Sequence, residues 1–327
     1  MTPRSIGRRA RTVAPAVLGL LLLAAPMTVA AASPVQVPAA RPATDDGPVP
    51  FDLSPTLAAA KRDYAAPYLD GCHVQQNGKA KKGASCLYGD LSSSTTIVLF
   101  GDSHALSWFP AVELMALREG WRLHVLTMST CSPADIPIWN SNYHRVSTEC
   151  TAWRKRAIAR IRADHPAVIL VAGTRGFTTP GPSGALLAGT ARTQAWQAGM
   201  KRTLGRLVPL ASRVIVLGDT PIAIQDPPTC LTAHPGSVLA CATPLARSID
   251  AAWAATEHHA ADIGNAGFVD PDLWVCPSSP CPVVIDGVLV FRDPGHLTAT
   301  YVETLGDILD ETVMADIEES LGITSFD

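Results

Sequence analysis

Three residues that lie far apart in the sequence have the side chains that nucleophilic acyl chemistry requires. Ser103 closely follows the apolar run 97–100, and Asp293 and His296 stand three apart near the other end of the chain, in the sequence Asp-Pro-Gly-His. A serine hydroxyl becomes a nucleophile when an imidazole takes its proton, and a third group must orient that imidazole. The spacing predicts a tight turn on which Asp293 holds one ring nitrogen of His296 while the other faces Ser103.

The position of Ser103 supports this hypothesis. It follows a predicted buried strand and precedes a helical pattern, and parallel-sheet proteins build their sites at that edge. Gly101 allows a sharp backbone turn, and a helix that begins after Ser103 would direct free N–H groups toward developing negative charge. Ala105 replaces the second glycine of the G-x-S-x-G pattern, which argues against an α/β-hydrolase elbow.

Three other polar residues are predicted to have structural rather than catalytic roles. His104 is adjacent to Ser103 on a strand-to-helix turn, where neighbouring side chains point apart, so we expect it to pack or to form a hydrogen bond. Asp102 is expected to hold the turn. Asp219 begins a similar motif, but Pro221 follows closely, and a second nucleophile is not expected there.

The rest of the sequence indicates the elements that must position these residues. Short β-branched runs at residues 96–100, 123–127, 168–172 and 213–217 predict strands. Helical spacing occurs at residues 106–119, 151–163, 190–208, 245–263 and 298–321. This alternation predicts an α/β fold with a mainly parallel sheet covered on both faces, which is a three-layer sandwich.

The composition excludes several classes of protein. The chain has 327 residues, of which 47% are hydrophobic and 17% charged, so it can bury one or two cores and is too apolar to be disordered. The formal net charge is −3, and four arginines lie within the first eleven residues. The remainder offers no basic stripe, so we expect no nucleic-acid partner.

The N-terminal region is typical of exported proteins. Residues 1–32 combine an arginine-rich start, an apolar centre and small residues at the end, which predicts a secretory signal peptide or, alternatively, an uncleaved anchor. Residues 33–52 are rich in Pro and Ala and predict a linker, and residues 53–327 predict one folded domain. We therefore expect a secreted or extracytoplasmic protein, tethered if the apolar segment is retained.

The cysteine content is also typical of an exported protein. The number of cysteines is even, so disulfides are expected in an oxidising compartment. No C-x-x-C spacing occurs, and we expect neither a metal nor another cofactor. Pairing each cysteine with the next would close four short loops, but the count alone leaves the connectivity open. The cysteines are Cys72, Cys86, Cys131, Cys150, Cys230, Cys241, Cys276 and Cys281.

Several short motifs lie between residues 70 and 309. They are Asp-Gly-Cys at 70–72, Gly-Asp-Ser-His-Ala at 101–105 with Trp108, Cys-Ser-Pro at 131–133, Cys150 with Trp153, Gly-Asp-Thr-Pro at 218–221 before Cys230, Trp-Val-Cys at 274–276 and Arg-Asp-Pro-Gly-His-Leu at 292–297. In combination they resemble the SGNH hydrolases. The closer resemblance is to the SGNH domains fused to acyltransferase-three membrane O-acetylases of bacterial surface polysaccharides.

This resemblance implies roles for the three residues described first. Ser103 would be the nucleophile, His296 the base and Asp293 its orienting partner. The resemblance also supports sequential pairing of the cysteines, and it implies an SGNH or flavodoxin-like sandwich stapled by disulfides. No multispanning domain precedes this one in the sequence, so a separate membrane acyltransferase is the expected acyl donor.

One block departs from the SGNH pattern. Typical members carry Gly-x-Asn-Asp, whose asparagine helps to stabilise the oxyanion, whereas this chain has Gly-Thr-Arg at 173–175. The oxyanion donors must therefore come from elsewhere. The candidates are the backbone N–H groups of Ser103 and Gly173, with Thr174 and residues 129–130 nearby.

Two residues are candidates for substrate binding. Arg175 could neutralise an acidic sugar or pair with a carboxylate, and the sequence favours neither. Trp108 could stack on a sugar, although packing in the core is the more frequent role of tryptophan.

Together these observations predict serine-dependent transfer or hydrolysis of an acetyl or similar acyl group. The expected substrate is cell-envelope polysaccharide, and the intermediate would be an acyl-enzyme on Ser103. The alternative is a catalytically silent glycan-binding or accessory module that has kept the fold.

Overall fold

A central sheet of six strands organises the domain. The computed structural model describes residues 46–79 and 85–322; the predicted leader and most of the predicted linker lie outside these ranges. The strands run in the order β1-β3-β2-β6-β7-β8, parallel except for the antiparallel edge strand β1. They are β1 (Leu87–Gly89), β2 (Thr96–Gly101), β3 (Arg122–Thr127), β6 (Val168–Ala172), β7 (Arg213–Leu217) and β8 (Gly267–Val269).

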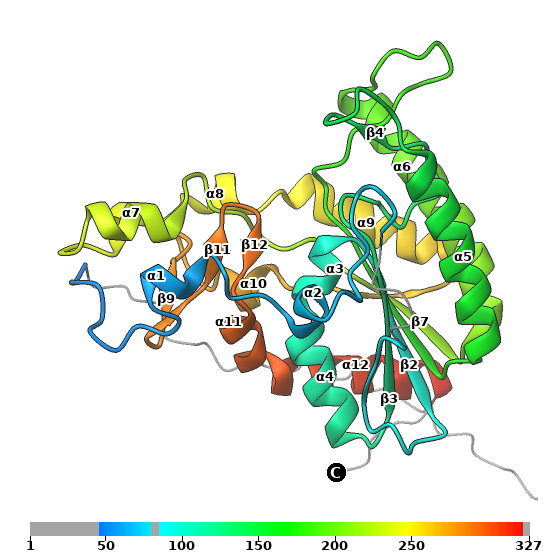
Figure 1. The fold of residues 1–327 in the computed structure, drawn as a ribbon, viewed down its shortest axis with the longest axis horizontal. Helices are drawn as coiled ribbons and strands as arrows, with labels where there is room; N and C mark the ends of the chain where they lie inside the picture. Colours follow the sequence, from blue (N-terminus) through cyan, green and yellow to red (C-terminus); the bar gives the residue numbers. More distant parts are fainter. Residues whose placement is uncertain (1–45, 80–84, 323–327) are drawn as a thin grey trace, which may run out of the picture. The chain divides into compact units, whose positions relative to one another are not determined.

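Alternate residues of the central strand pack into two separate cores. In β2, Ile97 and Leu99 face one core, and Val98 and Phe100 face the other. The first core also contains residues of α4 (Phe109–Arg118), α11 (Ala299–Thr304) and α12 (Gly306–Leu321). The second contains residues of α5 (Thr148–Asp164), α6 (Gly189–Leu207) and α9 (Ala251–Gly264). Figure 1 shows α5 and α6 on the opposite side of the sheet from α4. The predicted three-layer α/β sandwich is confirmed.

The remaining elements of the described residues are short. The helical ones are α1 (Leu57–Ala60), α2 (Ala66–Leu69), α3 (Ser103–Ser107), α7 (Pro227–Ala233), α8 (Leu245–Ser248), α10 (Asp272–Val275), η1 (Val208–Leu210) and η2 (Leu239–Cys241). Three small antiparallel pairs are formed by β4 (Trp139–Asn140) with β5 (Arg145–Val146), β9 (Val284–Ile285) with β10 (Val288–Leu289), and β11 (Phe291–Asp293) with β12 (His296–Leu297).

The four predicted strands are present, but three predicted helices are each divided. The helix expected at residues 106–119 is α3 and α4, because Pro110 lies in the first turn of α4 and cannot donate a backbone hydrogen bond. The helix expected at 245–263 is α8 and α9, separated by the extended residue Ile249. The helix expected at 298–321 is α11 and α12.

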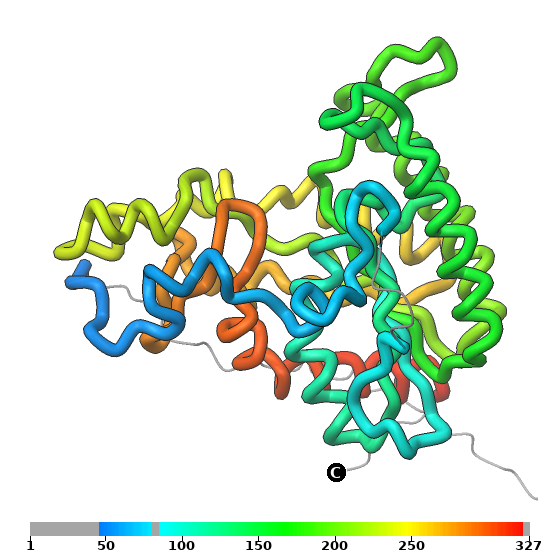
Figure 2. The backbone as a smooth tube through the Cα atoms, in the orientation of Figure 1, coloured from blue at the N-terminus to red at the C-terminus, as the bar shows by residue number. Residues whose placement is uncertain are grey.

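The N-terminal segment joins the fold near its C-terminal hairpins. Ser54 accepts a hydrogen bond from Leu289 at 2.8 Å and donates one to Gly287 at 3.0 Å. The N-terminal segment therefore lies beside the β9–β10 hairpin, as the tube in Figure 2 shows. Part of the predicted linker is also bound, because Val49 donates its backbone N–H to Pro235 at 2.9 Å. No helix in residues 46–79 and 85–322 has the length and apolar character to span a membrane.

All eight cysteines form disulfides with their sequence neighbours. The pairs are Cys72–Cys86, Cys131–Cys150, Cys230–Cys241 and Cys276–Cys281. The sequential pairing that the resemblance supported is therefore the one present in the structure. Each bridge closes a loop of at most 19 residues, so the disulfides fix local loops around the sheet rather than joining distant parts.

Candidate active site

The nucleophile motif forms a sharp turn at the carboxyl end of β2. Gly101 has φ +153°, and a Cβ there would lie 1.8 Å from the carbonyl oxygen of Ala172, so only glycine fits this close approach to β6. Asp102 is fully buried and caps α3: one of its carboxylate oxygens accepts the N–H of His104 at 2.9 Å. Ser103 is the first residue of α3.

The structure brings Ser103, His296 and Asp293 together. The Nε2 atom of His296 lies 3.0 Å from the Ser103 Oγ, and its Nδ1 lies 2.9 Å from Asp293 Oδ1. Asp293 Oδ1 also accepts the N–H of Gly295 at 2.9 Å and that of His296 at 3.0 Å. The carboxylate therefore shapes the turn between β11 and β12 and fixes the ring that the turn carries.

The surroundings keep the imidazole neutral and the carboxylate charged. Burial lowers the pKa of His296, and the His104 and Arg292 charges lower it further against the opposing effect of Asp293. Burial opposes ionisation of Asp293, but the hydrogen bond from His296 and the Arg292 charge hold the pKa of that carboxyl below its ordinary value. A neutral ring whose Nδ1–H is held by a carboxylate can accept the serine proton at Nε2.

The candidate oxyanion donors differ in availability. The backbone N–H of Thr174 donates to Asp102 Oδ2 at 3.0 Å, so this predicted donor is already used. Gly173 lies beside the same carboxylate, and a Cβ there would be 2.6 Å from the Pro133 ring, which explains the glycine. The N–H groups of Ser103 and Gly173 remain the candidates at this strand end.

Of the two roles considered for Arg175, the structure shows the pairing with a carboxylate. Its backbone N–H donates to Asp219 Oδ2 at 2.8 Å, and its guanidinium donates to the same oxygen at 3.2 Å. The guanidinium also donates to the carbonyls of Thr220 and Ser248, both at 3.1 Å. Because the side chain is only 15% exposed, it holds loops of the protein together rather than presenting its charge to a sugar.

The structure contradicts the substrate-binding role considered for Trp108. Its side chain is 1% exposed and packs edge-on against Trp274 with ring centroids 5.9 Å apart. It belongs to the core between α3 and α4 and cannot stack on a sugar.

A second histidine–aspartate pair lies beside the first, and sequence reasoning did not find it. His104 Nδ1 is 2.6 Å from Asp219 Oδ1, and the His104 ring is 5.0 Å from that of His296. The expected hydrogen-bonding role of His104 is therefore present. The available signal was the place of Asp219, which follows β7 at the same sheet edge as Ser103 follows β2.

This second pair is buried and charged. Burial opposes the charge on His104, but Asp219 raises the pKa of its imidazole. Burial also opposes ionisation of Asp219, whereas His104 and Arg175 lower the pKa of that carboxyl. Glu257 accepts the backbone N–H of Asp219 at 3.0 Å, and burial together with the Asp219 charge raises its pKa well above the ordinary value. The cluster thus places a cation next to His296.

Comparison with known families identifies the class. The family described as "SGNH domain (fused to AT3 domains)" matches residues 71–311, and the chain belongs to this family. The match includes all three residues of the Ser103 hydrogen-bond chain. A comparison with curated proteins found no match.

Solved structures are similar to this chain at low sequence identity. The periplasmic domain of a lipopolysaccharide acetyltransferase from Salmonella ser. Paratyphi A is similar with a TM-score of 0.54 and 14% identity, covering 69% of this chain and 85% of that one. A carbohydrate esterase family 2 enzyme from Corynascus thermopiles has a TM-score of 0.40, 15% identity and coverages of 70% and 67%. A carbohydrate acetylesterase from Sinorhizobium meliloti has a TM-score of 0.39, 15% identity and coverages of 68% and 99%.

Proposed function

We propose that this protein transfers or hydrolyses an acyl group, most simply acetyl, on cell-envelope polysaccharide through an acyl-enzyme on Ser103. The observation that carries the proposal is the continuous hydrogen-bond chain from Ser103 through His296 to Asp293, with distances of 3.0 and 2.9 Å. Membership of the SGNH family supports it, as does the similarity in fold to a periplasmic acetyltransferase domain.

The first half of the reaction forms the acyl-enzyme. Ser103 Oγ attacks the carbonyl carbon of the acyl donor while its proton moves to His296 Nε2, and Asp293 stabilises the resulting imidazolium. The N–H groups at the strand end, with Ser103 and Gly173 as candidates, face the developing oxyanion. The tetrahedral intermediate then collapses, and the leaving alcohol takes the proton from His296.

The second half returns the enzyme to its starting state. A sugar hydroxyl or water gives its proton to His296 Nε2 and attacks the ester carbonyl, and Ser103 leaves with that proton. Transfer and hydrolysis use the same groups and differ only in which hydroxyl reaches the ester. A separate membrane acyltransferase is our proposed source of the acyl group in the transferase case.

The four disulfides favour an extracytoplasmic location. Structural disulfides form and persist in oxidising compartments. The predicted signal segment lies outside the described residues, so secretion or tethering through it remains part of the proposal.

The experiment compares wild type with Ser103→Ala on isolated envelope glycans. Wild type should release acetate from O-acetylated glycan or load acetyl from a donor ester onto de-acetylated glycan, and Ser103→Ala should do neither. A serine-reactive fluorophosphonate should label wild type only. An unlabelled wild type with no turnover would contradict the proposal and favour a silent glycan-binding module.

A further inference from the structure

A cavity of about 180 Å³ opens at the same end of the sheet as Ser103. Its lining combines neutral hydrogen-bonding side chains with Trp139, Phe177 and Ile138, and no charged side chain is among the described residues that line it. The lining includes Gln76, Thr130, Trp139, Asn142, Thr174 and Thr178. The cavity is smaller than the roughly 300–1,000 Å³ clefts that hold drug-sized molecules, so it suits one small polar unit.

The cavity lies next to the nucleophile in the fold. Thr130 and Thr174 follow β3 and β6, the two strands that flank β2, and β2 leads into Ser103. Short hydrogen bonds tie both segments to the nucleophile turn: Met128 donates to the Gly101 carbonyl at 3.0 Å, and Thr174 donates to Asp102 at 3.0 Å. The cavity and the nucleophile turn are therefore connected through these two segments.

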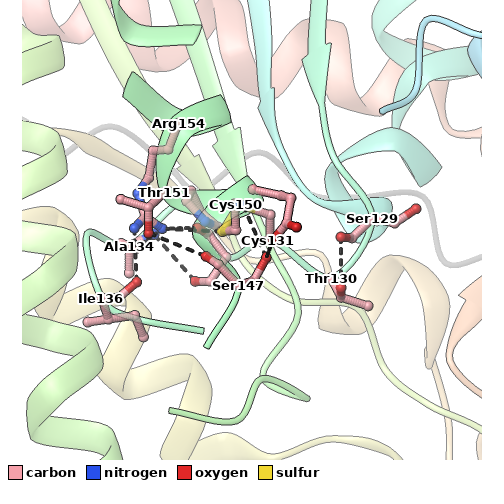
Figure 3. The surroundings of a disulfide bond; sticks show 12 residues. Ser129, Thr130, Cys131, Ala134, Ile136, Ser147, Cys150, Thr151 and Arg154 are labelled. Atoms are coloured by element: carbon pink, nitrogen blue, oxygen red, sulfur yellow. Dashed lines mark hydrogen bonds between the residues drawn. A yellow bond between two sulfur atoms is a disulfide. The ribbon is translucent and has the colours of Figure 1, made fainter. Parts of the chain in front are cut away.

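The loop that leads from Thr130 toward Trp139 is attached to α5. The Cys131–Cys150 disulfide anchors the residue after Thr130 to α5, and Figure 3 shows Arg154 of that helix holding the adjacent loop. The Arg154 guanidinium donates to the carbonyl of Ala134 at 2.6 Å and to that of Ile136 at 2.9 Å. Little ordering is then required when a ligand arrives, which favours affinity.

Hydrogen bonds also hold the part of the cavity lining that contains Trp139. Trp139 donates its backbone N–H to the Thr178 carbonyl at 2.8 Å, which pins β4 across the cavity. Trp139 is partly exposed, unlike the buried Trp108. Asn142 on the following turn donates to the Gln76 side chain at 2.8 Å, and this pair forms part of the rim.

We propose that this cavity is a subsite for one neutral sugar unit of the glycan, bound against Trp139 and hydrogen-bonded by the amides and hydroxyls around it. The inference rests on the proposed function and names the substrate class at that site. Neutral donors and acceptors match sugar hydroxyls, and an apolar ring matches the C–H face of a pyranose. The lining supplies no cation to balance a uronic acid at this position.

The experiment measures binding without turnover. Ser103→Ala protein is titrated by ligand-observed NMR with the tetrasaccharides of glucose, xylose and mannose, and with tetragalacturonic acid as the acidic probe. At least one neutral probe should bind more tightly than the acidic one. Adding Trp139→Ala should weaken that binding about tenfold, whereas Trp139→Phe should restore most of it.

Control variants separate binding from folding. Tyr143→Ala removes an exposed ring from the same hairpin that does not line the cavity, and it should leave the dissociation constant unchanged. Asn142→Ala, at the exposed turn, should weaken binding about threefold even if Trp139→Ala fails to fold.

Two results would overturn the inference. One is the absence of binding by every neutral probe, and the other is equal affinity in the Trp139, Asn142 and Tyr143 variants. Fluorophosphonate labelling of wild-type Ser103 tests the proposed function independently, because that reaction requires no sugar in the cavity.

Discussion

Ser103 and His296 are the two side chains that exchange a proton, so their replacement tests the residue-level account. Ser103→Ala and His296→Ala should each lower kcat for 4-nitrophenyl acetate by at least about a thousandfold. His104→Gln should retain activity within about tenfold at its optimal pH, because His104 bonds to Asp219 rather than to the nucleophile. Equal losses at His104 and His296, measured by initial rates, would contradict the assignment.

The charge on His104 has a separate consequence for the pH profile. His296 acts as a base only when neutral, and its lowered pKa places the acid limb of kcat/KM below the ordinary histidine range near 6.5. His104→Gln removes a cation whose ring is 5.0 Å away, so the pKa of His296 rises. The acid limb should move to higher pH by about 1 unit.

The matched control for this shift is His124→Gln. His124 forms another buried 2.6 Å pair, with Asp164, but is not among the groups that act on His296. Asp293, Arg292 and His104 are the charged groups that do. The control should leave the acid limb in place, and an unchanged limb in His104→Gln would show that the second pair does not act on His296.

Arg175 occupies the place of the missing asparagine, but its contacts argue against restoring one there. Arg175→Asn removes hydrogen bonds to Asp219 and to the carbonyls of Thr220 and Ser248. We expect a lower melting temperature and a fall in ester turnover of about tenfold or more, because a buried carboxylate loses a partner. Higher turnover in this variant would show instead that an oxyanion donor had been restored.

At the scale of elements, each disulfide should raise the free energy of unfolding by an amount that increases with the length of the loop it closes. Removing Cys131–Cys150, which spans 19 residues, with alanines should lower the free energy of unfolding by about 3 kcal/mol. Removing Cys276–Cys281, which spans five, should cost about 2 kcal/mol. Denaturant titration measures both, and a larger loss at the shorter loop would contradict the loop-closure account.

The elements also show what the sequence could predict and what it could not. β-branched runs located the four long strands because each is buried on both faces. The helix break at Ile249 has no glycine or proline of its own to mark it, whereas the break before α12 coincides with Gly306. Pro110 did carry such a signal, and it marks the start of α4.

Contacts within the site could be predicted where the residues involved lie close together in the sequence. Asp293 and His296 share one turn, so their spacing indicated their contact. The cluster of His104, Asp219 and Glu257 joins three distant segments, and nothing in a single stretch of sequence specifies that contact. The roles of Arg175 and Trp108 depend on burial, which composition alone does not determine.

At the scale of the whole molecule, the fold holds a serine turn from one end of the chain against a histidine turn from the other. Ser103 and His296 are 193 residues apart in sequence, and the sheet with its C-terminal hairpin brings them within 3.0 Å. The structure therefore preassembles the groups that attack and proton transfer require. The central claim is that this arrangement forms an ester on Ser103.

The most direct test is intact-protein mass spectrometry after brief exposure to 4-nitrophenyl acetate and an acid quench. Wild type should gain a single acetyl group that peptide mapping places on Ser103, whereas Ser103→Ala should gain none there or elsewhere above background. His296→Ala should acetylate far more slowly. An unmodified Ser103 in wild type, or equal acetylation of wild type and Ser103→Ala, would contradict the account.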